Sequence, residues 1–142
     1  MNATIVKFGY PSSLLREYAN WVVLLRPAQP TLGSLILACK EEATSLGAVS
    51  AEAYTELAIA TADLESALRT AFGCRKFNYL ALMMVDPHVH FHVIPRYSEP
   101  PQLDGAAFPD AAWPKPPDVT AALALTPAQM AALHARLRAA WP

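Results

Sequence analysis

Three histidines within five residues constrain this chain more than any other feature of its sequence. His88, His90 and His92 alternate strictly with Val89 and Phe91, and only one further histidine occurs among the 142 residues. Alternation of polar residues with β-branched and aromatic ones predicts a β-strand. Because side chains two positions apart on a strand share a face, we expect the three imidazoles to form a row on one face. The apolar residues between them then point into a core.

The spacing of this row limits its chemistry. Neighbouring rings should lie about 6.6 Å apart and the outer two Cα atoms about 13 Å apart, too far to share one Zn²⁺ whose bonds to nitrogen are about 2.0–2.1 Å long. We therefore expect no metal on the row. Two alternatives remain: a zinc held by a pair such as His88 and His90, and a purely structural role. A row of imidazoles better fits a chain of phosphates, at which imidazole can attack, donate a proton or stabilise charge.

The composition indicates one domain, residues 1–142, with an apolar surface. The hydrophobic fraction is 54%, the charged fraction 16% and the net charge −1. A homodimer is the simplest way to cover apolar surface, and a chain without basic excess is not expected to bind nucleic acid. Cys39 and Cys74 have no metal or redox spacing and predict free thiols, hence a cytoplasmic protein. No signal peptide or membrane helix is expected.

Periodicity and turn residues predict the remaining elements. Residues 21–25 and 35–39 are expected to form an antiparallel pair around a proline-containing loop, residues 4–8 an edge strand, and residues 12–18 one or two helical turns. A helix should begin after Ser50 and stop at Gly73. Residues 77–85 should form a strand joined to the histidine strand by a tight hairpin at Asp86-Pro87.

The last third of the chain has a different character. Residues 98–117 are rich in proline and predict an irregular surface segment, and Thr126 predicts the start of a C-terminal helix over residues 126–140. The order of elements indicates an α+β fold: an antiparallel β-sheet with one long helix packed on it and a C-terminal helix.

The histidine stretch resembles the signature of the histidine triad (HIT) family, in its bacterial branch. Residues 88–94 read His, apolar, His, apolar, His, apolar, apolar; residues 29–40, 78–80 and 95–97 also resemble family segments, and the similarity covers residues 21–97. The resemblance implies a HIT-like domain that acts as a nucleotide hydrolase or nucleotidyl transferase at the α-phosphate of nucleoside phosphoramidates or dinucleoside polyphosphates. It also implies a homodimer that requires no cofactor, with a divalent cation accompanying the substrate phosphates at most.

The same resemblance implies roles for individual residues. His90 would be the nucleophile, His92 would contact the phosphate oxygens, and His88 would orient or polarise His90. Leu24 and Ile36 match positions that line the nucleoside pocket of the family, although both would be apolar core residues in any version of this sheet.

Two positions depart from the family pattern. Met84, which we expect in the core, stands where a phosphate-binding Gln or Asn is common. Arg26 stands where an acidic or amide residue commonly holds the ribose; it would bind an additional anionic group or be an ordinary loop arginine. These departures leave an alternative function open, a nucleotide-binding HIT module with little or no turnover. A nucleic-acid end-processing enzyme of the same family is a weaker hypothesis, because the chain lacks a basic surface. Trp113 is expected to anchor the proline-rich segment or to stack on a base.

Overall fold

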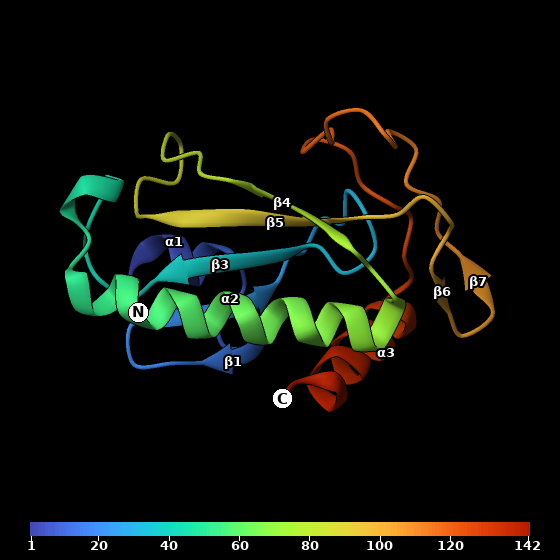
Figure 1. The fold of residues 1–142 in the computed structure, drawn as a ribbon, viewed down its shortest axis with the longest axis horizontal. Helices are drawn as coiled ribbons and strands as arrows, with labels where there is room; N and C mark the ends of the chain where they lie inside the picture. The colour runs from blue at the N-terminus through green and yellow to red at the C-terminus, as the bar shows by residue number, and fades with distance from the viewer.

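A five-stranded antiparallel sheet forms the centre of the computed structural model, which describes residues 1–142 (Figure 1). Its strands lie in the order β1-β2-β3-β5-β4, with bounds β1 Leu14–Glu17, β2 Trp21–Leu25, β3 Leu35–Cys39, β4 Lys76–Leu80 and β5 His90–Arg96. The helices are α1 Ala3–Lys7, α2 Ala51–Phe72 and α3 Pro127–Ala140, with a 3₁₀ turn at Leu46–Ala48. The α+β fold predicted from the sequence is confirmed.

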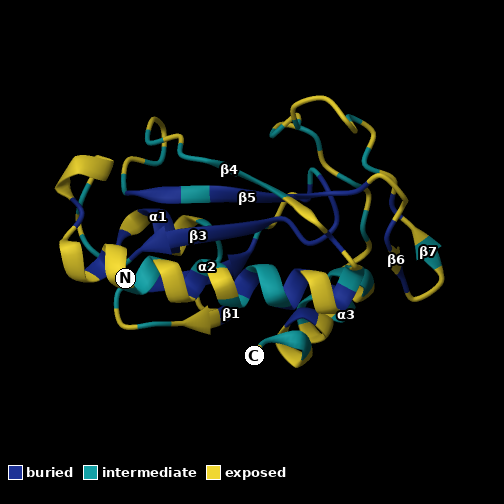
Figure 2. Ribbon diagram, viewed as in Figure 1, coloured by how far each residue is buried: buried dark blue, intermediate teal, exposed yellow.

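The two faces of the sheet are covered differently. The long helix α2 lies across the face that is nearer in Figure 1 and contributes to the main core with Trp21, Leu37 and Val93. The opposite face carries a small apolar cluster to which α1 contributes Ile5. Figure 2 shows that β3 and most of β5 are buried, and β2 is buried throughout. Burial on both faces explains why β2 and β3 are continuous apolar runs.

Both long helices begin at their predicted caps, and α2 also ends at its predicted stop. The Ser50 side chain accepts a hydrogen bond from the Ala53 amide at the start of α2, and Gly73 ends this helix in the left-handed conformation. Thr126 and Gln129 form a complete capping box at the start of α3.

The loop between β2 and β3 is organised by one buried amide. The Gln29 side chain donates to the carbonyls of Arg26 and Ser34 and accepts from the amides of Gly33 and Ser34, at distances of 2.6–3.1 Å. Gly33 has φ +88°, and a Cβ there would lie 2.8 Å from Leu68 Cδ2. The loop is therefore closely fixed, and Arg26 at its start is fixed with it.

Two predictions for the N-terminal residues are wrong. Residues 4–8 lie in α1 and its C-cap, because the Asn2 side chain caps the helix by accepting from the Ile5 amide. Residues 12–18 contain β1, because Leu14 and Glu17 pair with Leu24 and Val22 at the edge of the sheet. In both cases the local sequence is too short to specify a helix or a strand, and contacts with the rest of the fold determine which one forms.

The tight hairpin at Asp86-Pro87 is also wrong. β4 ends at Leu80 and pairs there with His92, so residues 81–89 form a longer connection and β5 begins only at His90. Asp86 forms an ion pair with Lys7 of α1, which draws this connection toward the N-terminal helix. Residues 98–117 are irregular as predicted, apart from the short ribbon of β6 Gln102–Leu103 and β7 Ala106–Ala107. None of the helices is long and apolar enough to cross a membrane.

Candidate functional site

The strand register gathers the predicted site residues on the face of the sheet that is turned away from α2. Ile36 of β3 lies opposite Leu24 on one side and His92 on the other, while Ala38 lies opposite His90. Since side chains at paired positions share a face, a row of apolar side chains leads across the sheet to the two imidazoles of β5.

His90 lies at the centre of this face and is fully buried. Its Nδ1 donates a hydrogen bond to the backbone carbonyl of His88, at 2.7 Å. A carbonyl can only accept, so Nδ1 carries the hydrogen and the lone pair is on Nε2. Nε2 has no hydrogen-bond partner among the protein's groups. The backbone thus holds His90 in the tautomer that leaves Nε2 able to attack an electrophile.

His92 has the opposite arrangement. Arg26 Nε donates to its Nδ1 at 3.2 Å, and the guanidinium is held in turn by the carbonyls of Ala28 and Val119, at 2.7 and 3.0 Å. Because an arginine N–H can only donate, Nδ1 accepts and Nε2 carries the hydrogen of a neutral ring. Burial, then the positive charge of Arg26, then His90 lower the pKa of His92 to about 4, against a smaller opposing effect of Asp86. His92 therefore offers one N–H donor at neutral pH.

His88 does not join the row, which corrects the expectation of three aligned imidazoles. It precedes β5, so the alternation of a strand does not apply to it; its ring lies between Thr4 Oγ1, 3.0 Å from Nδ1, and Glu42 Oε2, 3.0 Å from Nε2. Thr4 Oγ1 also accepts from the His88 amide at 3.3 Å, so its hydroxyl can donate to Nδ1 and leave Nε2–H for Glu42. Only His90 and His92 lie ring to ring, 5.1 Å between centroids.

The N-terminal residues close this face. The Phe8 ring lies 5.5 Å from the ring of His90 and 5.9 Å from that of His92. Asn2 Nδ2 fastens the segment by donating to the carbonyls of Cys39 and Glu41, at 2.9 and 3.1 Å. No cavity of the structure is lined by a histidine of the triad. The His90 Nε2 is therefore covered by the protein itself in this conformation.

The remaining residues that the sequence marks as candidates differ in burial and in their contacts. Leu24 and Ile36 are fully buried in one cluster with Ile5, so N-terminal side chains fill the space in which a nucleoside was expected. Met84 is 81% exposed on the connection between β4 and β5, and its assignment to the core is wrong. Arg26 is half-buried and bonded to His92, so it is not a free loop arginine.

Sequence reasoning missed the partners of the triad. Thr4, Phe8, Glu42 and Val119 all contact a triad histidine or Arg26, yet each is far from residues 88–92 along the chain. No short-range pattern marks them, because it is the fold that brings both ends of the chain to the site. No group of three or more His, Cys, Asp or Glu side chains is placed to hold a metal ion.

Comparisons with known proteins agree on the fold. No family model matches the sequence, and no curated protein does. A histidine triad protein from Sinorhizobium meliloti superposes with a TM-score of 0.75 and 18% identity, over 99% of this chain and 95% of that one. One from Marinobacter aquaeolei gives 0.71 and 25%, over 90% and 87%. A zinc-bound family member from Mycobacterium smegmatis gives 0.63 and 19%, over 96% and 88%. The chain has the fold of the histidine triad proteins.

Proposed function

We propose that this protein is a nucleotide hydrolase or nucleotidyl transferase that acts at the α-phosphate through His90. The observation that carries the proposal is the hydrogen bond from His90 Nδ1 to the His88 carbonyl, because it leaves a free lone pair on Nε2. His88 and His92 keep a hydrogen on Nε2, so His90 is the one triad ring suited to nucleophilic attack. The fold and the histidine pattern support the substrate class, a nucleoside phosphoramidate or a dinucleoside polyphosphate.

In the proposed reaction the His90 Nε2 lone pair attacks the α-phosphorus as the bond from phosphorus to the leaving amine or phosphate breaks. The leaving group takes its proton from water, because the neutral His92 can offer a hydrogen bond but no proton without becoming an imidazolate. Water then attacks the phosphorus of the nucleotidyl-His90 intermediate and passes its proton to the hydroxide left by the first step; the bond from phosphorus to Nε2 breaks, the mononucleotide leaves and the electron pair returns to Nε2. His92 Nε2–H would stabilise the charge on the phosphate oxygens, and the His88 carbonyl would stabilise the positive ring of the intermediate.

We further propose that no cofactor takes part. A nucleophilic His90 must keep its Nε2 lone pair free, and a metal ion would bind the same lone pair. A divalent cation would therefore accompany the phosphates only. Activity on a phosphoramidate should then persist when a chelator is present, and its loss with recovery on adding zinc would favour the pair of zinc-binding histidines.

A nucleotide-binding module with little turnover is the second candidate function. The observation that favours it is the cover over the site, since Phe8 and Ile5 close the histidines and the apolar row. Catalysis at His90 requires Phe8 to move, whereas a module that binds elsewhere does not. Release of mononucleotide from adenosine 5′-phosphoramidate separates the two. Turnover that is lost in His90→Asn supports the enzyme, no turnover in the wild type supports the module, and equal turnover in both proteins contradicts catalysis through His90.

We also propose a homodimer. β4 is an edge strand whose outer side is unpaired, and α2 exposes Tyr54 and Ile59. Sedimentation at micromolar concentration should give about twice 15.4 kDa; a single species of 15.4 kDa would contradict this part of the proposal.

A further inference from the structure

A polar pocket lies at the opposite end of β5 from the histidines. It is about 460 Å³ in volume and lies between the end of α2, the start of β4, the end of β5 and the proline-rich segment. Its charged and aromatic lining includes Phe72, Arg75, Lys76, Arg96 and Trp113. The volume falls within the range of about 300–1,000 Å³ that is usual for small-molecule sites. Arg96 lies six positions after His90 on β5, a distance of about 20 Å.

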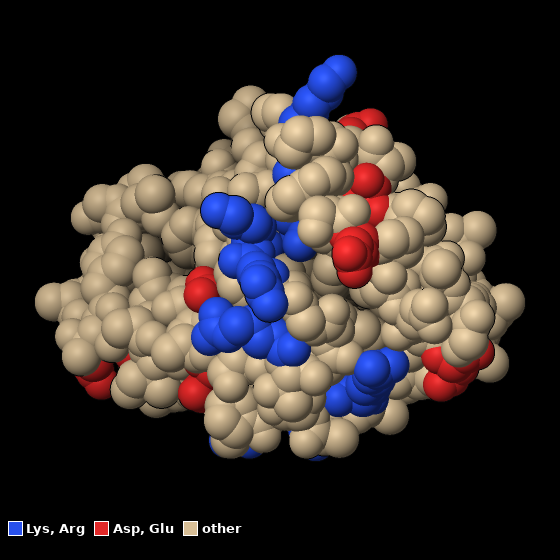
Figure 3. All heavy atoms as spheres, turned by 45° about the vertical axis from the view of Figure 1, so that its right-hand side comes forward, with Lys and Arg blue, Asp and Glu red and all other residues tan.

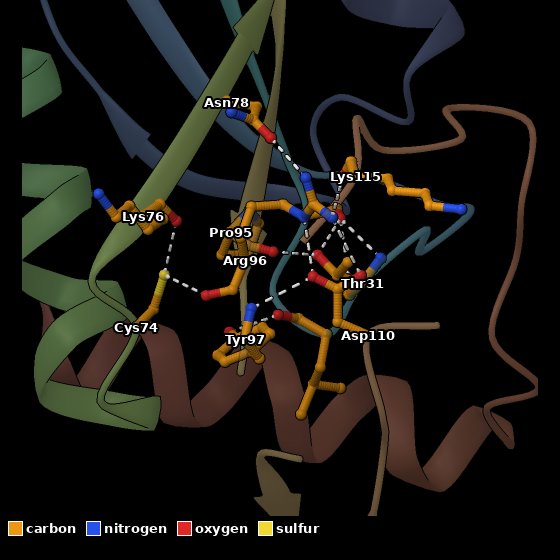
Figure 4. A network of polar contacts seen from close by, with 11 residues as sticks. Thr31, Cys74, Lys76, Asn78, Pro95, Arg96, Tyr97, Asp110 and Lys115 are labelled. Carbon is orange, nitrogen blue, oxygen red and sulfur yellow. Dashed lines mark hydrogen bonds and ion pairs between the residues drawn. The ribbon is translucent and has the colours of Figure 1, made fainter. Parts of the chain in front are cut away.

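The pocket has a rigid base. Arg96 and Asp110 form a buried ion pair of 2.8 Å, with side chains 5% and 1% exposed. Arg96 also donates to Asn78 Oδ1 at 2.8 Å and to the Lys115 carbonyl at 2.7 Å. Figure 4 shows the guanidinium of Arg96, which extends from β5, held by Asn78 of β4 and by Asp110 and Lys115 of the proline-rich segment. The segment that carries Trp113 is thereby fixed to the sheet.

More Lys and Arg side chains than Asp and Glu side chains surround the base of the pocket. Lys76 lies directly opposite Arg96 in the β4–β5 ladder, and like charges at such positions destabilise a sheet. Asp110 neutralises Arg96, but Arg75 and Lys76 are exposed and neither forms an ion pair, although Glu99 also lines the pocket.

Other cations reinforce the charge. Arg136 lies 4.7 Å above the ring of Phe72, a wall of the pocket, and forms no ion pair either. Figure 3, which brings this side of the molecule forward, shows a band of Lys and Arg side chains down the middle of the face. A protein with a net charge of only −1 thus concentrates positive charge at one pocket. Positive charge without carboxylate partners is a local cost that a functional site can explain.

We propose that this pocket binds a chain of two or more phosphates, as carried by a nucleotide or by inorganic polyphosphate. Arg75 and Lys76 would contact the phosphate oxygens, for which lysine and arginine are well suited. Trp113, 36% exposed at the pocket, offers a flat surface on which a base could stack. The site is separate from the histidines, and the proposal does not depend on chemistry at His90.

Calorimetric titration with tripolyphosphate, ATP and adenosine tests the proposal. Tripolyphosphate and ATP should compete for one site, adenosine alone should not bind, and affinity should fall as salt is raised. The double variant Arg75→Gln/Lys76→Gln should weaken both anions at least about 10-fold, because it removes two charge-assisted hydrogen bonds to the phosphates. Both side chains are exposed and make no side-chain hydrogen bond, and their removal relieves like charge beside Arg96, so the variant should unfold at a thermal midpoint no lower than that of the wild type.

Matched controls complete the design. Arg16→Gln/Arg138→Gln removes the same charge at two exposed positions outside the pocket and should leave both affinities unchanged. Trp113→Leu identifies the source of the phosphates: a loss of affinity for ATP alone indicates a nucleotide, and unchanged affinity for both indicates a bare phosphate chain. The proposal is overturned if neither anion binds, if Arg75→Gln/Lys76→Gln binds like the wild type, or if the control variant is weakened as much.

Discussion

The two ends of β5 show two ways to bury polar side chains on one sheet face. His90, His92 and Arg96 alternate along the same strand and share a face, and all three are buried. At the histidine end the rings are held by hydrogen bonds, and the pKa of His92 is lowered to about 4; at the other end Arg96 keeps its charge beside Asp110. A neutral ring can be buried with one partner, whereas a buried charge needs a counter-ion.

The ends also differ in access. Phe8 covers the histidines, while the pocket beside Arg96 is open and carries unpaired cations. We interpret the first end as a covered site for chemistry, which substrate and water reach when Phe8 moves, and the second as a site for binding of anions. The predictions below test this contrast, starting with the largest expected effect.

Replacing the proposed nucleophile should have the largest effect. His90→Asn keeps a side-chain N–H for the His88 carbonyl but has no Nε2, and we expect turnover of adenosine 5′-phosphoramidate to fall at least about 10³-fold. Arg75→Gln/Lys76→Gln, altered at the other end, should retain most of the turnover. Mononucleotide release measures both variants, and a His90→Asn protein that turns over within a few-fold of the wild type would remove His90 from the mechanism.

Breaking the ion pair between Arg96 and Asp110 should lower the stability of the fold. Arg96→Met leaves the buried Asp110 carboxylate without its counter-ion, and we expect the free energy of unfolding to fall by about 3 kcal/mol. Arg96→Met/Asp110→Asn, which removes both charges, should recover part of this loss. Urea unfolding measures both changes. Equal stabilities for Arg96→Met and the wild type would show that the buried Asp110 carboxylate does not need a counter-ion.

Opening the cover should increase access to the histidines. Phe8→Ala removes the ring over His90 and His92, and each reduction of about 1.4 kcal/mol in the stability of the closed conformation should raise kcat/KM about 10-fold. Val6→Ala is the control, because Val6 is exposed on the same short helix. A Phe8→Ala variant with unchanged kcat/KM, in a protein whose fold is intact, would mean that the cover does not limit access.

Replacing Arg26, which lies beside His92, should have the smallest effect. The effect should appear in the pH dependence of stability. The folded pKa of His92 lies below its ordinary value of 6.5, so the unfolded chain binds the extra proton and His92 lowers stability as pH falls from about 6.5 to about 4. Arg26→Met removes the positive charge beside the ring, so the pKa of His92 should rise and this pH dependence should shrink. NMR titration of the His92 ring measures the pKa; identical curves for variant and wild type would exclude a role for Arg26.

The sequence predicts the architecture well where an element carries a strong signal. The helix α2 has a cap, a stop and an apolar stripe, and β2 and β3 are uninterrupted apolar runs buried on both faces. The N-terminal elements are five residues or fewer and mix polar with apolar residues, so alternation and helical periodicity cannot be distinguished there. The prediction for His88 is wrong for a related reason. The alternation in the sequence includes His88, whereas the strand begins only at His90.

The candidate site is predictable in its reactive residues but not in its surroundings. Residues 88–92 place two imidazoles on one face because the period of a strand is local. The contacts of Arg26 with His92 and of Phe8 with both rings join segments that are distant in sequence, and no single-sequence pattern encodes such pairs. For the same reason the sequence suggests a ligand for Arg26, whereas in the structure Arg26 holds a catalytic candidate.

The central claim is that His90 Nε2 becomes covalently bound to the nucleotide. The direct test is to mix the protein with adenosine 5′-phosphoramidate, quench in alkali within a single turnover, and map the modified peptide by mass spectrometry. The account predicts one nucleotidyl group on His90 in the wild type, a larger yield in Phe8→Ala, and none in His90→Asn. Release of mononucleotide with no modified peptide, or a nucleotidyl group on His88 or His92 in place of His90, would contradict it.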